Sequence, residues 1–458
     1  MNWRLPLIWT LLEAGGSRIP AVLRLLHQSE KLPVSLLYRR QRQFQERLLR
    51  HAYQYVPYYR RILQECGVIT RSGEVALDRW SEIPILTKDL IRDHFEELQS
   101  SDPKRDRRRP YTNTSGGSTG EPLELIQDKV YRDWNIANKI YFKTFVGQKL
   151  GDREVRLWGS ERDVLEGREH LSVRMRNWLY NRREVNAFHF TDSAWKTFLD
   201  LLERWQPGLV EAYVEAADAA ADYITSQGAS FPAPRAVITS AGTLYEPMRR
   251  GIEKTFRCPV LNRYGSREVG DMACSCAVQP GLHLSLFHHV FEVTDSDFRP
   301  MQPVGTGHVI VTPLHNYSMP LIRYQIGDLA TTAGKSDSSC ECGRTWPLLG
   351  AVRGREVSMF RTRAGTLVDG EYFTHLLYFR PWCRRFQVVQ EDYDRIVFRV
   401  VLNAGLEKKF LADQGDIRAA VRAAMGPDCV VEFEPVKAID PLPSGKRIFC
   451  ISKVKFTT

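Results

Sequence analysis

The chain has 458 residues, of which 43% are hydrophobic, so it can bury substantial cores and its length predicts roughly two to three folding units. The formal net charge of +10 does not indicate nucleic-acid binding, because the basic residues are spread along the chain without an RNA-binding motif. Nine cysteines in a chain without a secretory leader argue against a disulfide framework and direct attention to metal ligands.

The first apolar stretch runs from Leu5 to Leu12, contains Pro6 and ends at Glu13. It is too short for a membrane span of roughly 20 residues, or for a signal segment with a cleavage site, so we expect a cytoplasmic protein. Two fates remain open for the stretch: packing onto the body, or forming an amphipathic element that contacts a membrane peripherally. The side chains of that element would be Trp3, Arg4, Leu7, Ile8, Leu11 and Leu12.

A run rich in glycine and hydroxyl side chains follows a basic segment, Lys104 to Arg109, that we expect to be a solvated loop. The run is Thr114-Ser115-Gly116-Gly117-Ser118-Thr119-Gly120. Its glycines allow a tight turn that brings N–H groups to an anion, so it predicts a phosphate-binding loop suited to ATP. It is not a Walker sequence, because Glu121 and Pro122 follow the last glycine. A cation must therefore come from elsewhere in the chain.

Four side chains after this run recur at offsets of three, four and three, which places them on one face of a helix. They are Tyr131, Trp134, Asn138 and Tyr141. An aromatic stripe of this kind is typical of plain core.

The remaining periodicity predicts an α/β body and a smaller α+β tail. In the body we expect strands over Arg235–Thr239 and Gly307–Thr312 and a helix over Gln206–Gln227 ended by Gly228. In the tail we expect a strand over Arg395–Val401 and a helix over Asp416–Met425 stopped by Gly426. A boundary near Gly354 divides the chain into residues 1–353 and 354–458.

Cysteine and histidine gather between these segments. Cys276 and His283 are seven residues apart, and Cys340-Glu341-Cys342 follows in a later loop. Three cysteines and one histidine satisfy a tetrahedral structural Zn²⁺ site, with Cys274 as a substitute ligand. The spacing alone leaves reduced, unliganded cysteines as an equal alternative.

Four further segments complete a set of ordered motifs. They are Asn262-Arg263-Tyr264-Gly265-Ser266-Arg267-Glu268, Leu321 to Asp328, Gly354-Arg355, and Leu442-Pro443-Ser444-Gly445-Lys446. With the glycine-rich run, they resemble in order and spacing the core motifs of the adenylate-forming ligases. Within that superfamily the chain resembles the phenylacetate-CoA ligase group and its relatives called CapK or coenzyme F390 synthetase-like, from Ala52–Tyr59 and Ile83–Lys88 onward.

The resemblance implies an ATP-dependent ligase with a large N-terminal domain, which binds ATP and the acyl group, and a small mobile C-terminal domain. A carboxylate attacks the α-phosphate of ATP to give acyl-AMP and pyrophosphate, and CoA or another acceptor then displaces AMP. An amine, a hydroxyl or a carrier protein in polysaccharide or natural-product biosynthesis is the alternative acceptor. A catalytically degenerate nucleotide-binding or scaffold protein is the alternative of another class. We expect no nucleic-acid partner and leave the oligomeric state open, a homodimer included.

The same resemblance implies residue roles. In relatives the helix after the glycine-rich run lines the acyl pocket, so Tyr131, Trp134, Asn138 and Tyr141 would line a pocket for an aromatic or other flat substrate. The glycine-rich run and Tyr264, Gly265, Ser266 and Arg267 bind ATP, while Asp328 accepts hydrogen bonds from the ribose. Glu268 binds Mg²⁺, a hard cation that prefers oxygen ligands. Arg355 contacts the nucleotide near a hinge at about Ser358, and Lys446 bridges the acyl carboxylate and the phosphate. Some relatives have a similar cysteine, Gly-Leu-His and Cys-x-Cys-Gly-Arg pattern, which assigns Zn²⁺ to Cys276, His283, Cys340 and Cys342.

Departures from the family pattern limit these assignments. Glu121 replaces a frequent lysine, Arg267 replaces a small hydroxyl residue, and the segment after Arg355 lacks an aspartate pair. Gly242 stands where relatives often have glutamate, so contacts to the adenine or the acyl group at this acyl-pocket position are expected to differ.

Overall fold

The computed structural model describes the chain except for residues 1, 71, 116–122, 159–170, 186–191, 302–303, 334–339, 356–358, 365–366, 379, 440–447 and 455–458. It divides into two compact units. The first comprises Met1–Leu244 and Met248–Val352, and the second comprises Tyr245–Pro247 and Arg353–Thr458. The predicted fold class, a large α/β unit with a smaller α+β unit, is confirmed.

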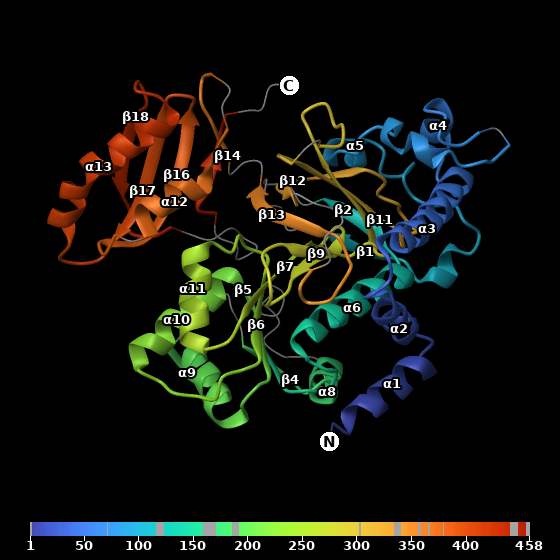
Figure 1. Ribbon diagram of the computed structural model, residues 1–458, viewed down its shortest axis with the longest axis horizontal. Helices are drawn as coiled ribbons and strands as arrows, with labels where there is room; N and C mark the ends of the chain where they lie inside the picture. Colours follow the sequence, from blue (N-terminus) through green and yellow to red (C-terminus); the bar gives the residue numbers. More distant parts are fainter. Residues whose placement is uncertain are drawn as a thin grey trace. The chain divides into compact units, whose positions relative to one another are not determined.

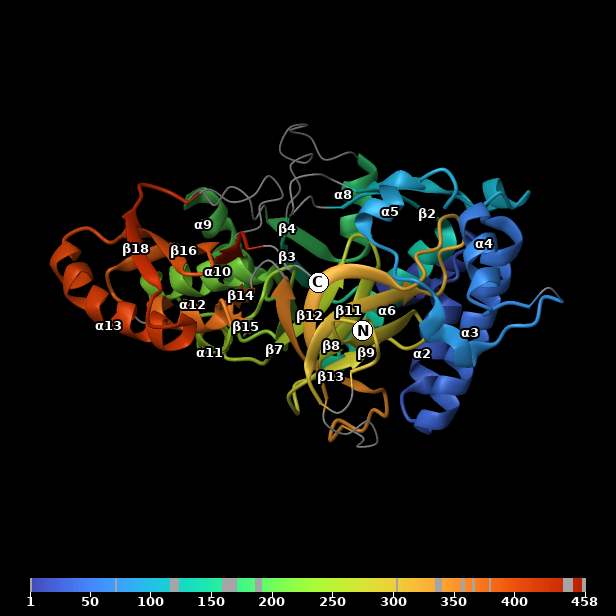
Figure 2. The ribbon, with the colours of Figure 1, turned by 90° about the horizontal axis from the view of Figure 1, so that it is seen from above.

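The helices of the larger unit surround its sheet (Figures 1 and 2). They are α1 (Arg4–Ala14), α2 (Ile19–Ser29), α3 (Val34–Tyr55), α4 (Pro57–Glu65), α5 (Lys88–Asp93), α6 (Lys129–Lys143), α8 (Leu171–Leu179), α9 (Asp192–Asp200), α10 (Val214–Gln227) and α11 (Glu246–Phe256). Short helical turns are η1 (Leu77–Glu82), η2 (Arg105–Arg108), η3 (Thr144–Val146) and η4 (Leu201–Trp205). Among the described residues, no helix has the length and apolarity needed to cross a bilayer.

The main sheet contains eleven strands within the described ranges. In spatial order they are β10 (His289–Thr294), β11 (Thr306–Pro313), β12 (Tyr324–Thr332), β13 (Leu348–Arg355), β9 (Leu282–Leu284), β8 (Gly270–Ser275), β7 (Val260–Ser266), β6 (Ala236–Ser240), β5 (Leu209–Tyr213), β3 (Glu154–Leu157) and β4 (Arg182–Val185). Strands β4, β3, β5, β6 and β7 are parallel, whereas β8 and β9 continue antiparallel from β7. Strand β7 therefore joins the two parts of the sheet.

The strand predictions at Arg235–Thr239 and Gly307–Thr312 are confirmed by β6 and β11. The helix predicted over Gln206–Gln227 is wrong in its first third, because Leu209–Tyr213 forms strand β5 and helix α10 begins at Val214. The first four residues of β5 are buried between parallel neighbours, which favours an extended conformation over a continuation of the alanine-rich helix. Gly228 ends α10 with a φ of 58°, as predicted for a helix stop.

In the described part of the smaller unit, two helices pack with a four-stranded sheet of order β18-β17-β16-β19. Its elements are β14 (Met359–Arg361), β15 (Leu367–Asp369), α12 (Gly370–Tyr378), β16 (Cys383–Asp392), β17 (Arg395–Leu402), α13 (Glu407–Met425), β18 (Val430–Pro435) and β19 (Cys450–Ser452). The predicted strand over Arg395–Val401 is confirmed by β17. The predicted last helix ends at Met425, as expected before Gly426, but starts nine residues earlier than predicted, at Glu407.

Candidate functional site

A short hairpin holds both ends of the glycine-rich run. Its strands are β1 (Tyr111–Thr114) and β2 (Glu124–Gln127). The backbone N–H of Ser115 donates to the carbonyl of Leu123 at 2.8 Å, and the N–H of Leu123 donates to Ser115 Oγ at 2.8 Å. Residues 116–122 lie outside the described residues. Because Ser115 Oγ acts here as an acceptor, its hydroxyl proton is left to donate to a further group.

This hairpin is hydrogen-bonded to the turn that follows β7. Gln127 Nε2 donates to the carbonyls of Arg267 at 2.9 Å and Glu268 at 3.1 Å, and Asn113 Nδ2 donates to the carbonyl of Arg267 at 3.2 Å. Asn113 also donates to Gln127 Oε1 at 3.0 Å, which orients both amides. Two segments about 140 residues apart in sequence, both assigned to ATP, therefore lie side by side.

Strand β7 also reaches the aspartate assigned to the ribose. The hydroxyl of Tyr264 donates to Oδ2 of Asp328 at 2.7 Å. Next along the strand, Gly265 lies so close to β8 that a Cβ there would come within 2.7 Å of the Gly270 carbonyl. Ser266, Arg267 and Glu268 follow, and the last of these side chains is buried. The structure thus brings the hairpin, this turn and Asp328 together.

The space beside Gly242 is filled by another carboxylate. A Cβ at Gly242 would come within 2.8 Å of Glu215 Oε1, which lies in the first turn of α10. Glu215 therefore places a carboxylate beside position 242, where the family resemblance led us to expect a glutamate. The sequence could not reveal this proximity, because it depends on how α10 packs beside the end of β6.

The aromatic stripe predicted on α6 is buried. Tyr131, Trp134, Asn138 and Tyr141 all have exposed fractions of 6% or less. Trp134 stacks on His315 with ring centroids 3.7 Å apart, and Asn138 Nδ2 donates to the carbonyl of Asp271 at 2.5 Å. These side chains take part in core packing, and their role in an acyl pocket stays a prediction.

Sequence reasoning missed a cluster of charged side chains between α6 and the sheet. Glu211 in the middle of β5 is its hub, at 2.7 Å from Lys143 Nζ, 2.8 Å from Arg156 Nη2 and 2.7 Å from Arg263 Nη2. Arg263 Nε also lies 3.3 Å from Asp271 Oδ2. Charged residues inside otherwise apolar strands were the signal that could have indicated this cluster.

Part of this cluster is left without full hydrogen bonding. Asp271 Oδ2 and two guanidinium nitrogens of Arg263, Nε and Nη1, are buried and find no hydrogen-bond partner among the described residues. Lys139 Nζ lies 4.0 Å from Asp271 Oδ2, and the Lys139 side chain is 32% exposed. Asp271 raises the pKa of Lys139, but burial and Arg263 outweigh it and leave this pKa below its ordinary value. A polar ligand could satisfy these groups.

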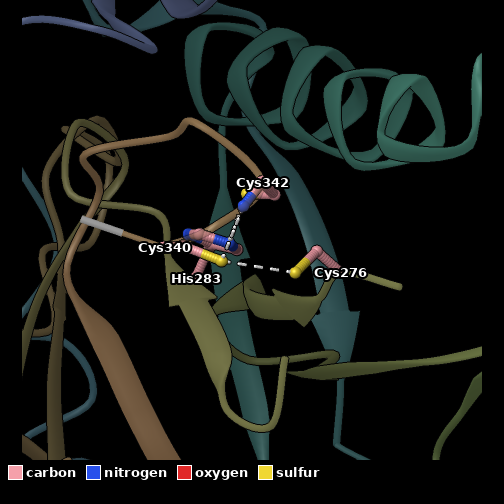
Figure 3. Close-up of side chains that lie close together, drawn as sticks. All are labelled: Cys276, His283, Cys340 and Cys342. Atoms are coloured by element: carbon pink, nitrogen blue, oxygen red, sulfur yellow. Dashed lines mark hydrogen bonds between the residues drawn. The ribbon is translucent and has the colours of Figure 1, made fainter. Parts of the chain in front are cut away.

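The cysteine and histidine side chains predicted to bind zinc come together (Figure 3). Cys276 follows β8, His283 lies in β9, and Cys340 and Cys342 belong to the loop before β13. Their ligand atoms all lie within 4.8 Å of one another. Cys276 Sγ and Cys340 Sγ are 3.5 Å apart, and Cys342 Sγ is 3.4 Å from His283 Nε2.

This arrangement fits a tetrahedral metal ion. Sulfur ligands about 2.3 Å from Zn²⁺ lie about 3.8 Å apart in a tetrahedron, close to the separations of the cluster. His283 Nδ1 lies 3.3 Å from the carbonyl of Trp346, an acceptor, so Nδ1 carries the proton and the lone pair of Nε2 is left to bind a metal ion among the four ligand atoms. Four protein ligands would complete the coordination shell, so the site suits a structural role.

Three predicted residues cannot be compared with this geometry. Lys446 and Ser358 lie outside the described residues. Arg355 is the last residue of β13, and only its backbone is described. The roles assigned to all three stay predictions.

The chain is similar to known proteins over most of its length. A family model for the CapK C-terminal domain matches residues 360–453. Protein CapK of Staphylococcus aureus is 24% identical over 385 residues, which cover 82% of this chain and 80% of CapK. The phenylacetate-coenzyme A ligase of Thermus thermophilus is 24% identical over 379 residues, which cover 79% of each chain.

A solved structure has a similar fold. The crystal structure of 2-hydroxyisobutyryl-CoA ligase in the postadenylation state, with bound R3-HIB-AMP, superposes with a TM-score of 0.69 at 17% identity. The superposition covers 93% of this chain and 91% of that ligase.

Proposed function

We propose that this chain, which belongs to the adenylate-forming ligases, uses ATP to convert a carboxylic acid into an acyl-AMP and then transfers the acyl group to an acceptor. The observation that carries the proposal is the hydrogen-bonded contact between the β1–β2 hairpin, the Ser266–Glu268 turn and, through Tyr264, Asp328. The three segments assigned to ATP are far apart in sequence, and a nucleotide site needs them adjacent.

Each of these residues would have a separate role in adenylation. Ser115 and the loop it anchors would hold ATP phosphates, and Asp328 would accept hydrogen bonds from the ribose hydroxyls, with its carboxylate oriented by Tyr264. Glu268 would hold Mg²⁺, which neutralises phosphate charge when bound. Lys446 supplies the cation that the loop lacks. No nucleophilic side chain is needed, because the substrate carboxylate itself attacks the α-phosphate.

CoA is the acceptor that we propose first. The similarity to a phenylacetate-coenzyme A ligase supports it, whereas the similarity to CapK leaves an amine, a hydroxyl or a carrier protein as the second candidate. The two candidates differ in product. Incubation with ATP, the activated acid and CoA yields a thioester in the first case, and only acyl-AMP and its hydrolysis products in the second.

The charged cluster favours a polar acid over an aromatic one. Arg263 pairs with Ser240, the last residue of β6, so it lies at the carboxyl edge of the parallel strands, where open α/β sheets bind ligands. The half-exposed Lys139 and the unsatisfied Asp271 lie beside it. We therefore propose that the acyl group carries a hydroxyl, amino or second carboxyl group near its activated carboxylate.

The experiment that tests the function is carboxylate-dependent exchange between ATP and pyrophosphate. The panel should compare acids that bear hydroxyl, amino or second carboxyl groups with benzoic and phenylacetic acids. Exchange with any acid supports the ligase activity. A preference for the aromatic acids would contradict the proposed polar acyl group but would leave the ligase activity supported. ATP binding without exchange for any acid would support the degenerate nucleotide-binding alternative.

We also propose that Cys276, His283, Cys340 and Cys342 hold one structural Zn²⁺. The donor set and the spacing of the four ligand atoms support this assignment. The ion would tie the loop before β13 to β8 and β9, and so stabilise the part of the sheet next to β7 without taking part in the chemistry.

A further inference from the structure

Helices α1 and α8 carry exposed apolar side chains that meet at two tryptophans. The rings of Trp3 and Trp178 are 6.0 Å apart, so the start of α1 lies beside the end of α8, near the N-terminus in Figure 1. From this point Leu7 and Leu11 continue along α1 at intervals of four residues, on one helix face. Met175 and Leu171 do the same along α8 at intervals of three and four. We name these six side chains the α1–α8 surface: Trp3, Leu7, Leu11, Leu171, Met175 and Trp178.

The exposure of these side chains is high for residues of this type. It reaches 71% for Leu171, 63% for Met175, 61% for Trp178, and 51% for both Trp3 and Leu11. Single exposed apolar residues are common on proteins, but two exposed stripes that meet at a pair of tryptophans are characteristic of an interaction surface.

Helix α1 is held in place, so its outer face is a feature of the fold. Asn2 Nδ2 donates to the carbonyl of Leu150 at 2.7 Å and to Asp152 Oδ1 at 2.9 Å. On the inner face, Ile8 is buried at 1% exposure, while Leu7 and Leu11 point outward. The inner face of α1 therefore packs onto the body, the first of the two fates left open by the sequence, and contact of the outer face with a membrane stays a prediction.

The charged residues of the two helices are almost all basic. Arg4 lies over both tryptophans, 4.6 Å from the Trp3 ring and 5.7 Å from the Trp178 ring. Arg174 and Arg176 are exposed on α8, which contains no acidic residue, and the acidic residue of α1 is Glu13, in its last turn. Apolar side chains rimmed by arginine are complementary to the interface of a membrane with anionic headgroups.

We propose that the α1–α8 surface binds the surface of an anionic membrane. Tryptophan prefers the depth of the headgroups, and the arginines would contact lipid phosphates while the leucines and Met175 enter the outer acyl region. A second copy of the chain fits less well. A twofold contact through this surface would bring the arginines of the two copies together, with Glu13 in the last turn of α1 as the one acidic residue on these two helices.

The test is sedimentation of the full chain with vesicles of phosphatidylcholine containing about a quarter phosphatidylglycerol. The probe variant carries Leu11→Ser and Met175→Ser, one change on each helix, and the control carries Leu411→Ser, which alters a leucine of α13 that is 65% exposed. We expect the natural chain and the control to bind, the probe variant to bind about tenfold more weakly, and about 0.5 M salt to weaken binding. Melting temperatures of the three proteins should agree within a few degrees.

Three results would overturn the proposal. One is no binding to these vesicles by the natural chain, and another is equal binding by the probe variant. The third is a concentration-dependent dimer, seen by light scattering, that the probe variant abolishes while vesicle binding is absent, which would assign the surface to a second copy.

Discussion

The hydroxyl of Tyr264 donates a 2.7 Å hydrogen bond to Oδ2 of Asp328, joining strand β7 to strand β12. The bond uses one of the two carboxylate oxygens and fixes the direction of the other. An ionised carboxylate only accepts hydrogen bonds, so an oriented Asp328 is suited to receive them from ribose hydroxyls.

The first prediction follows from this pair. Asp328→Asn should weaken ATP binding by about 10-fold to 100-fold, because a hydrogen bond to a charged acceptor is worth about 1.5–3 kcal/mol. Tyr264→Phe should have a smaller effect, since it loosens the carboxylate without removing it. Calorimetric titration with ATP measures both changes.

The control is Asp297→Asn, which changes an exposed aspartate in the turn between β10 and β11. It should bind ATP as the natural chain does. Unchanged affinity in Asp328→Asn would remove the ribose role from this residue.

The second prediction concerns the metal. Protein purified without chelators should contain about one Zn²⁺ per chain by elemental analysis. Cys340→Ser should lose the ion and lower the melting temperature by roughly 5–10 °C, because a metal bound only by the folded chain stabilises it. Cys66→Ser changes a cysteine outside the cluster and should retain both metal and stability. A metal-free natural chain would leave the four side chains as reduced, unliganded groups.

The sequence could indicate elements whose signals are local. Gly228 and Gly426 mark where α10 and α13 end, and the apolar run before Ser240 forms β6. Strand β5 was not predicted, because its apolar run is short and the alanine-rich segment that follows it has helical periodicity. The extended conformation of this segment depends on its pairing with the parallel strands β3 and β6.

In the candidate site, too, some residues were indicated by local motifs, whereas others are recognised only by their contacts in the fold. The ordered motifs indicated Tyr264, Glu268 and Asp328, and the cysteine and histidine spacing indicated the proposed zinc ligands. Arg263 lies inside one of these motifs, yet its ion pairs with Glu211 and Asp271 depend on strand pairing. The proximity of the Glu215 carboxylate to Gly242 likewise depends on tertiary packing. Such relationships between distant residues are absent from local patterns.

The third prediction tests the charged cluster by pH at Glu154 of β3, whose Oε1 lies 2.7 Å from Lys143 Nζ and 2.8 Å from Arg156 Nε. Burial alone would raise the pKa of Glu154, but Lys143, Arg156 and Arg182 outweigh it and lower this pKa to about 2. The unfolded chain has a pKa near 4.5, so the stabilisation is fully present above that pH and is lost as the pH falls toward 2. In Glu154→Gln, the difference in unfolding free energy between neutral and acidic pH should be smaller by up to about 3 kcal/mol.

Urea unfolding at neutral and acidic pH measures this effect. Glu184→Gln is the matched control, because Glu184 lies 3.8 Å from Arg156 and its side chain is 32% exposed, so its ion pair should contribute little. If the two variants had the same pH dependence, the cluster would not be the source of the acid sensitivity.

The last prediction separates the two half-reactions at Lys446. Adenylation brings together a carboxylate and a triphosphate, both anionic, and the glycine-rich run contains no lysine, so a cation from another segment must lower the barrier. Loss of a contact worth about 3 kcal/mol in the transition state corresponds to about a hundredfold in rate. Lys446→Ala should therefore slow acyl-AMP formation by about two orders of magnitude or more. Lys437→Ala, which removes an exposed lysine of the same unit, should leave that rate unchanged. The second half-reaction should depend less on this lysine. Transfer from acyl-AMP supplied from outside should change only a few-fold in Lys446→Ala, because pyrophosphate has already left and its charge no longer needs a partner.

Stopped-flow measurement of pyrophosphate release and of AMP release from supplied acyl-AMP distinguishes the two half-reactions. An equal loss in both would assign Lys446 to folding or to binding of the adenylate, and an unchanged rate of acyl-AMP formation would assign the cation of the site to another residue, with Arg267 the first candidate.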